Sequence, residues 1–391
     1  MKAMQSAWGR VERRRWRERE LPRRRRLALA AAPLLVAASY AAGWLGPVQA
    51  LERKTADLRF TWKPPRSPDP RILTVSVDEA TLAAEHPADA IAPILERIFD
   101  AGARGVAVDL LLPERWSHSR AFGRLVLEHA DDLTLAVHSS TVGEVVGAEC
   151  IDPLVASALG PERLSDLFAF VNLDKDPDGV MRTARLAYQD GTGAHRPAFG
   201  PRAARALIPL GAPPDTQAHR FWIDHSISRR DLRHLPWASV ARQIESDPSV
   251  FQGRLVVVGA NYVGAGDIHE VPSRPGSPAT MWGFEIQALI ADTVASGLPV
   301  RELTSPLFPA AAGLTCAGAL LGLLALSRAR VAPAVFAILA AAFLAGSYLA
   351  FRLTLILVPF VGPMLVWMLA LGLGLVLRRV LPPFPDAFGE V

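Results

Sequence analysis

The sequence predicts an α/β extracytoplasmic domain with a mainly parallel sheet, plus an α-helical transmembrane region of four spans. Two observations predict the α/β domain. Strand-length apolar runs alternate with segments of helical periodicity, and the run Leu255–Val258 is rich in β-branched residues without a polar interruption. Such a run is typical of a strand buried on both faces inside a parallel sheet. A third observation, four long apolar runs outside the domain, predicts the membrane region.

Four apolar runs divide the 391-residue chain into five parts. These runs are Leu27–Leu45, Leu307–Leu326, Val331–Ala350 and Leu353–Leu377. Each approaches the length that crosses a hydrocarbon core about 30 Å thick at about 1.5 Å per residue. We therefore expect a basic cytoplasmic tail over 1–26, a transmembrane signal anchor over 27–46, an extracytoplasmic domain over 50–305, three transmembrane helices over 307–380 and a short cytoplasmic tail over 381–391.

Arginines predict the orientation of the spans. Basic clusters lie in every second connection between the predicted spans, and therefore on one side of the membrane, namely Arg23–Arg26, the Arg328/Arg330 turn and Arg378/Arg379. Cytoplasmic connections carry an excess of Lys and Arg, so both termini are expected in the cytoplasm and the domain outside a bacterial inner membrane. Arg352, in a short outer connection, is a single exception.

The basic N-terminal tail has two possible partners. The net charge of +4 conceals a strong concentration of arginine between Arg10 and Arg26, which could contact nucleic acid or a membrane surface. Because the apolar run from Leu27 follows directly, we expect a membrane and no nucleic acid. This run is either an uncleaved anchor, which we favour, or a signal sequence cleaved near Val48–Ala50.

The first half of the domain predicts alternating helices and strands. Leu51–Phe60 has a helical pattern, is stopped by prolines and is expected to connect the anchor to the domain. Strands are expected at Ile72–Val77, Gly105–Leu112 and Leu133–Val137. Between the first two, Ala90–Ala101 predicts a helix that Gly102 terminates. This alternation favours parallel pairing.

The second half predicts a less regular arrangement that leads into the membrane. Strands Phe168–Asn172 and Val180–Tyr188 are expected around an acidic turn. The remaining expected elements are a helix at Pro201–Leu210, a strand at Phe221–Ile223, a helix at Ala238–Ile244 and a final helix at Met281–Ser296 that ends at Gly297.

An ordered set of short motifs carries a family resemblance. The motifs are Val75–Leu82, Gly102–Asp109, Asp176–Arg182, Gly253–Gly259, Asp267 with Pro272, and Trp282–Ala288. Together they resemble the CHASE domain of the second type, an extracytoplasmic sensory domain of bacterial signalling proteins, over roughly residues 50–305 and the trailing helices. The sequence departs from the family pattern in Glu114–Ala121, which lacks the acidic residue that the family pattern has just before the next helix, and at Gln287, where histidine is common.

The resemblance implies a sensory role. Family members usually continue into a cyclase, kinase or phosphatase domain, whereas only Arg378–Val391 follows the last span here. We therefore expect a stand-alone sensor that acts on a separate cytoplasmic or membrane effector, without enzymatic activity of its own and without a cofactor. The glycines and alanines of the spans also permit a homo-oligomer.

Four polar residues are the candidate ligand-binding residues. Asp78 and Asp109 fall at the ends of two expected strands, and Asn261 and Asp267 lie in the glycine-rich loop after Leu255–Val258. In open α/β sheets the carboxyl ends of the strands form the usual binding crevice, so these acids could converge on a cation or a cationic ligand. The alternative is that each acid caps a local helix or loop.

The acidic turn is a candidate metal site of a different kind. Asp174, Asp176, Asp178 and Gly179 match the first half of a calcium loop, but Arg185 stands where the bidentate glutamate is required. A turn with aspartate caps is the alternative. The loop Gly259–Gly266 matches neither common phosphate-binding glycine pattern.

Three functions are consistent with these features. We favour a membrane-anchored sensor that binds a ligand or a partner protein and relays a signal through its helices. A membrane scaffold that senses nothing, and a metal-dependent extracytoplasmic hydrolase using Asp78, Asp109 and Asp267, are the alternatives.

Overall fold

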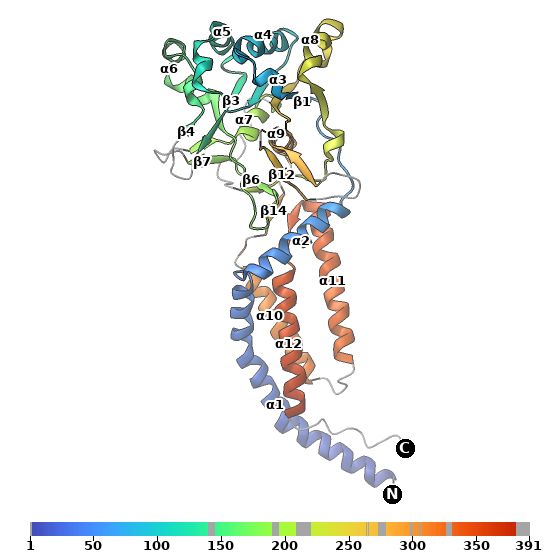
Figure 1. Ribbon diagram of the computed structural model, residues 1–391. Coiled ribbons are helices and arrows are strands. Elements are labelled where there is room, and N and C mark those ends of the chain that lie inside the picture. The colour runs from blue at the N-terminus through green and yellow to red at the C-terminus, as the bar shows by residue number, and fades with distance from the viewer. Residues whose placement is uncertain are drawn as a thin grey trace. The chain divides into compact units, whose positions relative to one another are not determined.

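The computed structural model describes residues 2–139, 145–189, 195–208, 220–262, 264, 266–272, 279–297, 300–303, 305, 307–325 and 331–380. The chain forms two compact units (Figure 1). One is the domain Phe60–Arg301, and the other combines Met1–Arg59 with Glu302–Val391. The α/β part of the chain, Phe60–Arg301, is therefore a compact unit of its own.

A mainly parallel sheet forms the centre of the domain (Figure 1). Its strands run in the order β10-β1-β11-β2-β3-β4, and β5 also pairs with β3. Their bounds are β1 Ile72–Val77, β2 Gly105–Asp109, β3 Leu133–Ser139, β4 Val145–Val146, β5 Phe168–Phe170, β10 Arg233–Pro236 and β11 Leu255–Ala260. Among these described strands β4 alone is antiparallel to its neighbour. The predicted α/β class is confirmed.

Strand β11 lies in the middle of this sheet although it is the last to be added along the chain. It pairs in parallel with β1 on one side and with β2 on the other. All six of its residues are buried, as the uninterrupted apolar run predicts. The residues at the carboxyl ends of β1, β11 and β2 are consequently neighbours.

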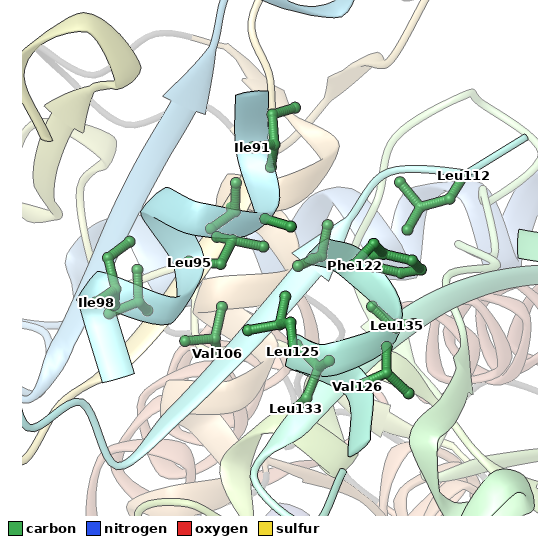
Figure 2. Packing of buried hydrophobic residues seen from close by; sticks show 14 of the residues in the cluster. Ile91, Leu95, Ile98, Val106, Leu112, Phe122, Leu125, Val126, Leu133 and Leu135 are labelled. Atoms are coloured by element: carbon green, nitrogen blue, oxygen red, sulfur yellow. The ribbon is translucent and has the colours of Figure 1, made fainter. Parts of the chain in front are cut away.

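Four longer helices cover one face of the sheet, namely α4 Pro87–Asp100, α5 Arg120–His129, α6 Pro153–Leu167 and α8 Trp237–Ser246. Their apolar sides meet alternate residues of the strands in one cluster. Figure 2 shows Leu95 of α4 and Leu125 of α5 close to Val106 and Leu133 of the sheet. Helix α4 ends where Gly102 adopts a φ of 88°, which confirms the predicted cap.

Two helices cover the opposite face, α7 Phe199–Ala204 and α9 Gly283–Ala295. Helix α9 packs directly on β11, and its residues from Gly283 to Val294 are all buried. The contact is close because Gly259 has no side chain: an added Cβ would overlap the Cβ of Phe284. This helix is therefore a central element of the domain, buried between the sheet and α7.

Some elements differ from the predicted ones. The expected strand Val180–Tyr188 is divided into β6 Thr183–Ala184 and β7 Ala187–Gln189, because the first pairs with β9 Phe221–Trp222 and the second with β8 His195–Pro197. Strand β2 ends at Asp109 rather than Leu112. The expected helix Pro201–Leu210 is shorter and starts earlier, and its last two residues lie outside the described ranges.

The remaining elements of the domain are short. They are α3 Glu79–Leu82, β12 Ile268–Glu270, β13 Thr280–Trp282, β14 Arg301–Glu302 at the end of the domain, and the 3-10 helices η1 Glu114–His118, η2 Ala148–Cys150, η3 Arg229–Asp231 and η4 Pro248–Val250. Strands β12 and β13 pair as an antiparallel ladder that places Ile268 opposite Trp282. This ladder holds the loop after β11 against the start of α9.

The second unit is helical. It contains α1 Lys2–Ala42, most of α2 Gly46–Trp62, α10 Leu307–Ala325, α11 Val331–Thr354, α12 Val361–Val380 and the short strand β15 Ile356–Leu357. Helices α1, α10 and α12 contact one another around an apolar cluster. Gly313 allows α10 to approach α1 closely, since an added Cβ would meet the backbone of Val36.

The four predicted spans are not confirmed. By length and composition, one stretch among the described residues could cross a membrane alone, Ala334–Thr354 in α11. Glu18–Ala42 passes the same criterion only together with Gly46–Trp62, from which it is bent by 70°. Leu307–Leu320 and Val361–Leu377 are shorter apolar helices.

The close contact between β11 and α9 predicts the effect of a small substitution. We expect Gly259→Ala to lower the free energy of unfolding by about 1 to 3 kcal/mol, because the new methyl group forces α9 away from the strand. Urea unfolding of the full-length protein in detergent, followed by near-ultraviolet circular dichroism, measures this. Gly46→Ala is the control, since an added Cβ there meets nothing within 4 Å. Equal midpoints for the two variants would contradict the packing argument.

Candidate functional site

Three of the four candidate ligand-binding residues lie at the carboxyl ends of adjacent strands. Val77 is in register with Ala260, and Gly259 with Asp109, so β1, β11 and β2 end side by side. Asn261 continues this edge because its backbone N–H donates to Val77 O at 3.2 Å. The sheet thus brings the ends of the predicted strands together, as an open α/β sheet does at a binding crevice.

Asp78 serves as a helix cap. Its carboxylate accepts hydrogen bonds from the backbone N–H of Thr81 at 2.8 Å and from the Thr81 hydroxyl at 2.7 Å. These bonds hold the pKa of Asp78 below its usual value. Asp78 therefore stabilises the first turn of α3, which is the local role that the sequence left open.

Asp109 and Asp267 form an acidic pair. Burial raises the pKa of Asp109 well above its usual value, and the negative charge of Asp267 raises it further. No described residue forms a hydrogen bond or ion pair with the Asp109 carboxylate, which is half-buried at the end of β2. A carboxylate in this position is destabilised by its surroundings unless a proton or a cation joins it.

Asp267 is positioned over the first turn of α9. Its backbone oxygen accepts a hydrogen bond from Gly283 N–H at 2.9 Å, and a side chain at Gly283 would overlap the Asp267 carboxylate. The partial positive charge at this helix N-terminus favours a carboxylate there. Asp267 Oδ1 also lies 2.8 Å from Nε2 of His269, whose Nδ1 is buried without a hydrogen-bond partner among the described residues.

The acidic turn is held together by arginines. Both oxygens of Asp178 accept from the buried guanidinium of Arg182, at 2.7 and 2.9 Å. Asp176 accepts from Arg182 at 2.9 Å and from Arg220 at 3.0 Å, while Asp174 pairs with Arg185 at 2.5 Å. Within the described residues no group of three or more His, Cys, Asp or Glu could hold a metal ion. The arginine pairs neutralise these carboxylates, as in a structural turn.

A buried charge cluster that sequence reasoning missed fixes the connector to the domain. Asp224 is paired with Lys63 Nζ at 3.1 Å and with Arg66 Nε at 3.2 Å. Arg66 also pairs with Asp292 of α9, which accepts a further hydrogen bond from Asp69 N–H at 2.6 Å. Asp224 and Asp292 are 2% and 0% exposed. We call these five residues the connector latch.

The two acids of the connector latch respond differently to burial. Burial raises the pKa of Asp292 despite its bonds to Asp69 N–H and Arg66. For Asp224 burial acts in the same direction, but hydrogen bonds from Ser226 and the charge of Lys63 outweigh it and lower the pKa. The only sequence signal was the proximity of Lys63 and Arg66 to the proline-rich connector, which did not reveal partners more than 150 residues away.

A second missed cluster attaches the edge strand β10. His234 Nε2 lies 3.1 Å from Ser76 Oγ, and His234 Nδ1 lies 3.2 Å from Thr74 Oγ1. The Thr74 hydroxyl donates to Arg233 O at 2.8 Å, so it accepts from Nδ1–H and leaves Nε2 to accept from Ser76. Ser76 is 3% exposed, and the arrangement replaces apolar packing between β1 and β10 with hydrogen bonds.

The departure from the family pattern at Gln287 has a structural explanation. Its side chain accepts from Gly200 N–H at 3.0 Å and donates to Val171 O at 3.2 Å. Gln287 is buried and joins α9 to the start of α7 and to the end of β5. An amide satisfies both a backbone donor and a backbone acceptor at once.

The geometry defines an α/β domain with a half-buried acidic pair at the carboxyl end of its parallel sheet. A family model for the CHASE2 domain matches residues 31–326, and the chain belongs to this family. CHASE2 is a family of extracytoplasmic sensory domains, which confirms the predicted resemblance. No curated protein and no solved structure matches the chain.

The acidic pair predicts a stabilising substitution. At neutral pH, Asp109→Asn should raise the free energy of unfolding, because it removes a charge that burial and Asp267 both oppose. The raised pKa means that the stability deficit appears as pH rises above the unfolded value of Asp and is absent at lower pH. Urea unfolding of the full-length protein at pH 7 and pH 4 measures it. Lower stability of the variant at pH 7 would show that the carboxylate has a stabilising partner.

A buried histidine predicts acid sensitivity of the domain. His225 is 3% exposed, and burial lowers its pKa to about 4. The unfolded chain takes up this proton near pH 6.5, so stability should fall as pH decreases from about 6.5 towards 4. His225→Gln should flatten this profile in urea unfolding series. His86→Gln, at a side chain that is 73% exposed, should keep it. Identical profiles for His225→Gln and the parent would contradict the assignment.

Proposed function

We propose that this protein is a membrane-anchored extracytoplasmic sensor. Its α/β domain binds a small cationic ligand at the carboxyl end of the sheet and relays a conformational bias through the connector to its helices and to a separate effector. Asp109 and Asp267 supply the negative charge of the site, and Asn261 and His269 supply polar groups beside it. Burial is the main cause of the raised pKa of Asp109, and repulsion from Asp267 adds to it. A cation between the carboxylates would offset both effects.

One observation carries the relay: helix α9 contributes to both the acidic pair and the connector latch. Its first residue, Gly283, contacts Asp267, and Asp292 near its other end pairs with Arg66 of the connector. The helix has 13 residues, which corresponds to about 20 Å. Because α9 is buried along this length, a shift at the first turn cannot be absorbed by exposed side chains.

A ligand can produce such a shift only if it binds two states of the domain with different affinity. Without a cation, repulsion between Asp109 and Asp267 favours a larger separation of the loop after β11 from the end of β2. With a cation, attraction favours a smaller one. Asp267 rests on the first turn of α9, so the two separations correspond to two positions of that helix end.

Membrane anchoring is the second part of the proposal. The support is the extracytoplasmic family, the apolar stretch Ala334–Thr354 and the packing of apolar helices α1, α10 and α12 around a common cluster. We propose four spans in the bacterial inner membrane, with both termini in the cytoplasm and the domain outside. The basic clusters of the sequence orient the spans in this way.

The metal-dependent hydrolase gains no support from the described residues. That function requires three acids around one ion, whereas Asp78 is engaged by Thr81 and no described cluster could hold a metal. A scaffold that senses nothing requires no ligand at the acidic pair, so the binding experiment below distinguishes it from a sensor.

Ligand binding is tested with defined cations. The full-length protein in detergent is titrated with Mg²⁺, Ca²⁺, putrescine and spermidine while its unfolding temperature and the hydrogen exchange of residues 60–69 are measured. At least one cation should raise the unfolding temperature and alter exchange in the connector. Gly283→Ala, which displaces the Asp267 carboxylate without changing charge, and Asp267→Asn should each weaken binding about tenfold or more.

Two controls make this experiment decisive. Asp174→Asn changes an acid that already pairs with Arg185, and it should leave cation binding unchanged. Arg66→Gln should keep binding but abolish the response of the connector, since it breaks the latch to Asp292. Absence of binding by every cation, or equal binding by Asp267→Asn, would reject the site and favour the scaffold.

The topology is tested with fusions. Alkaline phosphatase fused after Ser305 should be active and the same enzyme fused after Val391 inactive, because the first position is extracytoplasmic and the second cytoplasmic in the proposed arrangement. A green fluorescent protein at Val391 is the complementary reporter and should fluoresce. The opposite pattern of activities would reject the proposed orientation.

A further inference from the structure

Helix α2 has an exposed apolar stripe along one side. Leu51, Leu58 and Trp62 are 55%, 48% and 54% exposed. At 3.6 residues per turn these side chains and Pro47 fall within an arc of about 60°. Trp44, which precedes the helix, is 84% exposed. Apolar residues gathered on one side of a helix require a partner more strongly than single exposed ones do.

The other sides of α2 are distinct in character. Val48, Ala56 and Arg59 are buried on a different side of the helix, where Val48 lies beside Gly362 of α12. Gln49, about 160° around the helix from Leu51, is exposed and polar. Lys54 borders the stripe, and its long aliphatic stem can lie along an apolar surface while its ammonium group stays in water. Helix α2 is therefore amphipathic, with an apolar stripe separate from its buried face.

Glu52 fixes α2 to the start of α12. Its two carboxylate oxygens accept hydrogen bonds from the backbone N–H groups of Phe360 at 2.7 Å and of Val361 at 2.6 Å. The buried side chain of Arg59 pairs with the same carboxylate at 3.5 Å. The N-terminus of α12 is thus capped by a residue of another helix. This interaction holds α2 at the level of the first turn of α12.

The direction of α2 also differs from that of a span. The helix is bent by 70° from Glu18–Ala42 at the break before Gly46. Helices α11 and α12 also expose apolar side chains, as the stripe does. These are Ile338, Leu349, Leu353, Met368, Leu369 and Val376. A helix that crosses the end of such a bundle lies where headgroups meet acyl chains.

We infer that α2 is an interfacial helix whose apolar stripe inserts into the outer leaflet of the membrane. Tryptophans near both ends fit this location, because the indole ring is favoured at the boundary between headgroups and hydrocarbon. An interfacial helix of this kind is buried about 5–10 Å into the boundary region. The inference rests on the proposed membrane anchoring and assigns the connector a lipid contact of its own.

The inserted helix gives the connector a fixed support. Residues 63–69 follow α2 directly and carry Lys63 and Arg66 of the connector latch. A helix held flat on the membrane resists motion along the membrane normal but can rotate or slide in the plane. The lipid contact would therefore restrict the movement that the domain passes to its anchor.

The test uses spin labels on the full-length protein in vesicles of phosphatidylethanolamine and phosphatidylglycerol. Cys150 and Cys316 are buried and are first replaced by alanine. Single variants Leu51→Cys and Leu58→Cys then report the stripe. Gln49→Cys reports the polar side of α2 as the matched control, and Ile338→Cys, 67% exposed on α11, reports the proposed span. Accessibility to oxygen and to a water-soluble nickel chelate is measured at each position.

Labels at positions 51 and 58 should show an oxygen-to-nickel accessibility ratio several-fold above that at 49 and below that at 338. A water-like ratio at 51 and 58, with a lipid-like ratio at 338, would overturn the inference while leaving the anchoring intact. Low accessibility to both reagents with spin–spin broadening would show that a second copy covers the stripe, which also overturns it. A water-like ratio at 338 would overturn the anchoring and the inference together.

Discussion

The contact between α9 and β11 is the constraint on which the domain depends. Gly259 brings the backbone of the central strand against Phe284, and α9 is buried from Gly283 to Val294. Protein interiors are packed as densely as organic crystals, so a helix in this position moves as a unit. The candidate site and the connector latch occupy opposite ends of the same rigid element.

Buried charges in this domain fall into two kinds. Asp176, Asp224 and Asp292 each pair with an arginine or a lysine. The pairs of Asp224 and Asp292 join segments more than 150 residues apart, whereas Asp176 pairs with Arg182 within its own turn. Asp109 differs, because its strongest described electrostatic neighbour is another carboxylate. Burying an unpaired charge is costly unless a proton or a cation compensates it. Asp109 therefore lacks the compensation that the paired acids receive.

In the helical unit, too, a carboxylate is paired with partners from another helix. Glu52 is placed beside two backbone N–H groups that have no partner within α12, and Arg59 offsets the charge of the carboxylate. The interaction orients α2 so that one side is buried and another presents leucine and tryptophan. Polar bonds thus fix the position of a helix that also exposes apolar side chains.

The sequence by itself determined the α/β class, most strands and the order of helices, because periodicity and glycine caps act locally. Leu255–Val258 predicted a strand buried on both faces, and Gly102 and Gly297 predicted helix ends that have positive φ angles of 88° and 62°. The sequence also identified Asp109 and Asp267 as candidates. It could not distinguish them from Asp78, since all three follow or end a strand or loop and any of them could be a cap.

Tertiary structure alone decided which polar residues meet. The edge strand β10 contains a proline and two basic residues and has no strand-like pattern, yet it pairs with β1 through His234. The connector latch joins Arg66 to Asp292, and Glu52 caps α12 across more than 300 residues. Such pairings depend on which distant segments meet in the tertiary structure, and local composition carries no information about those contacts. Local forces specify the elements, whereas the burial of charge is resolved only when distant segments pack.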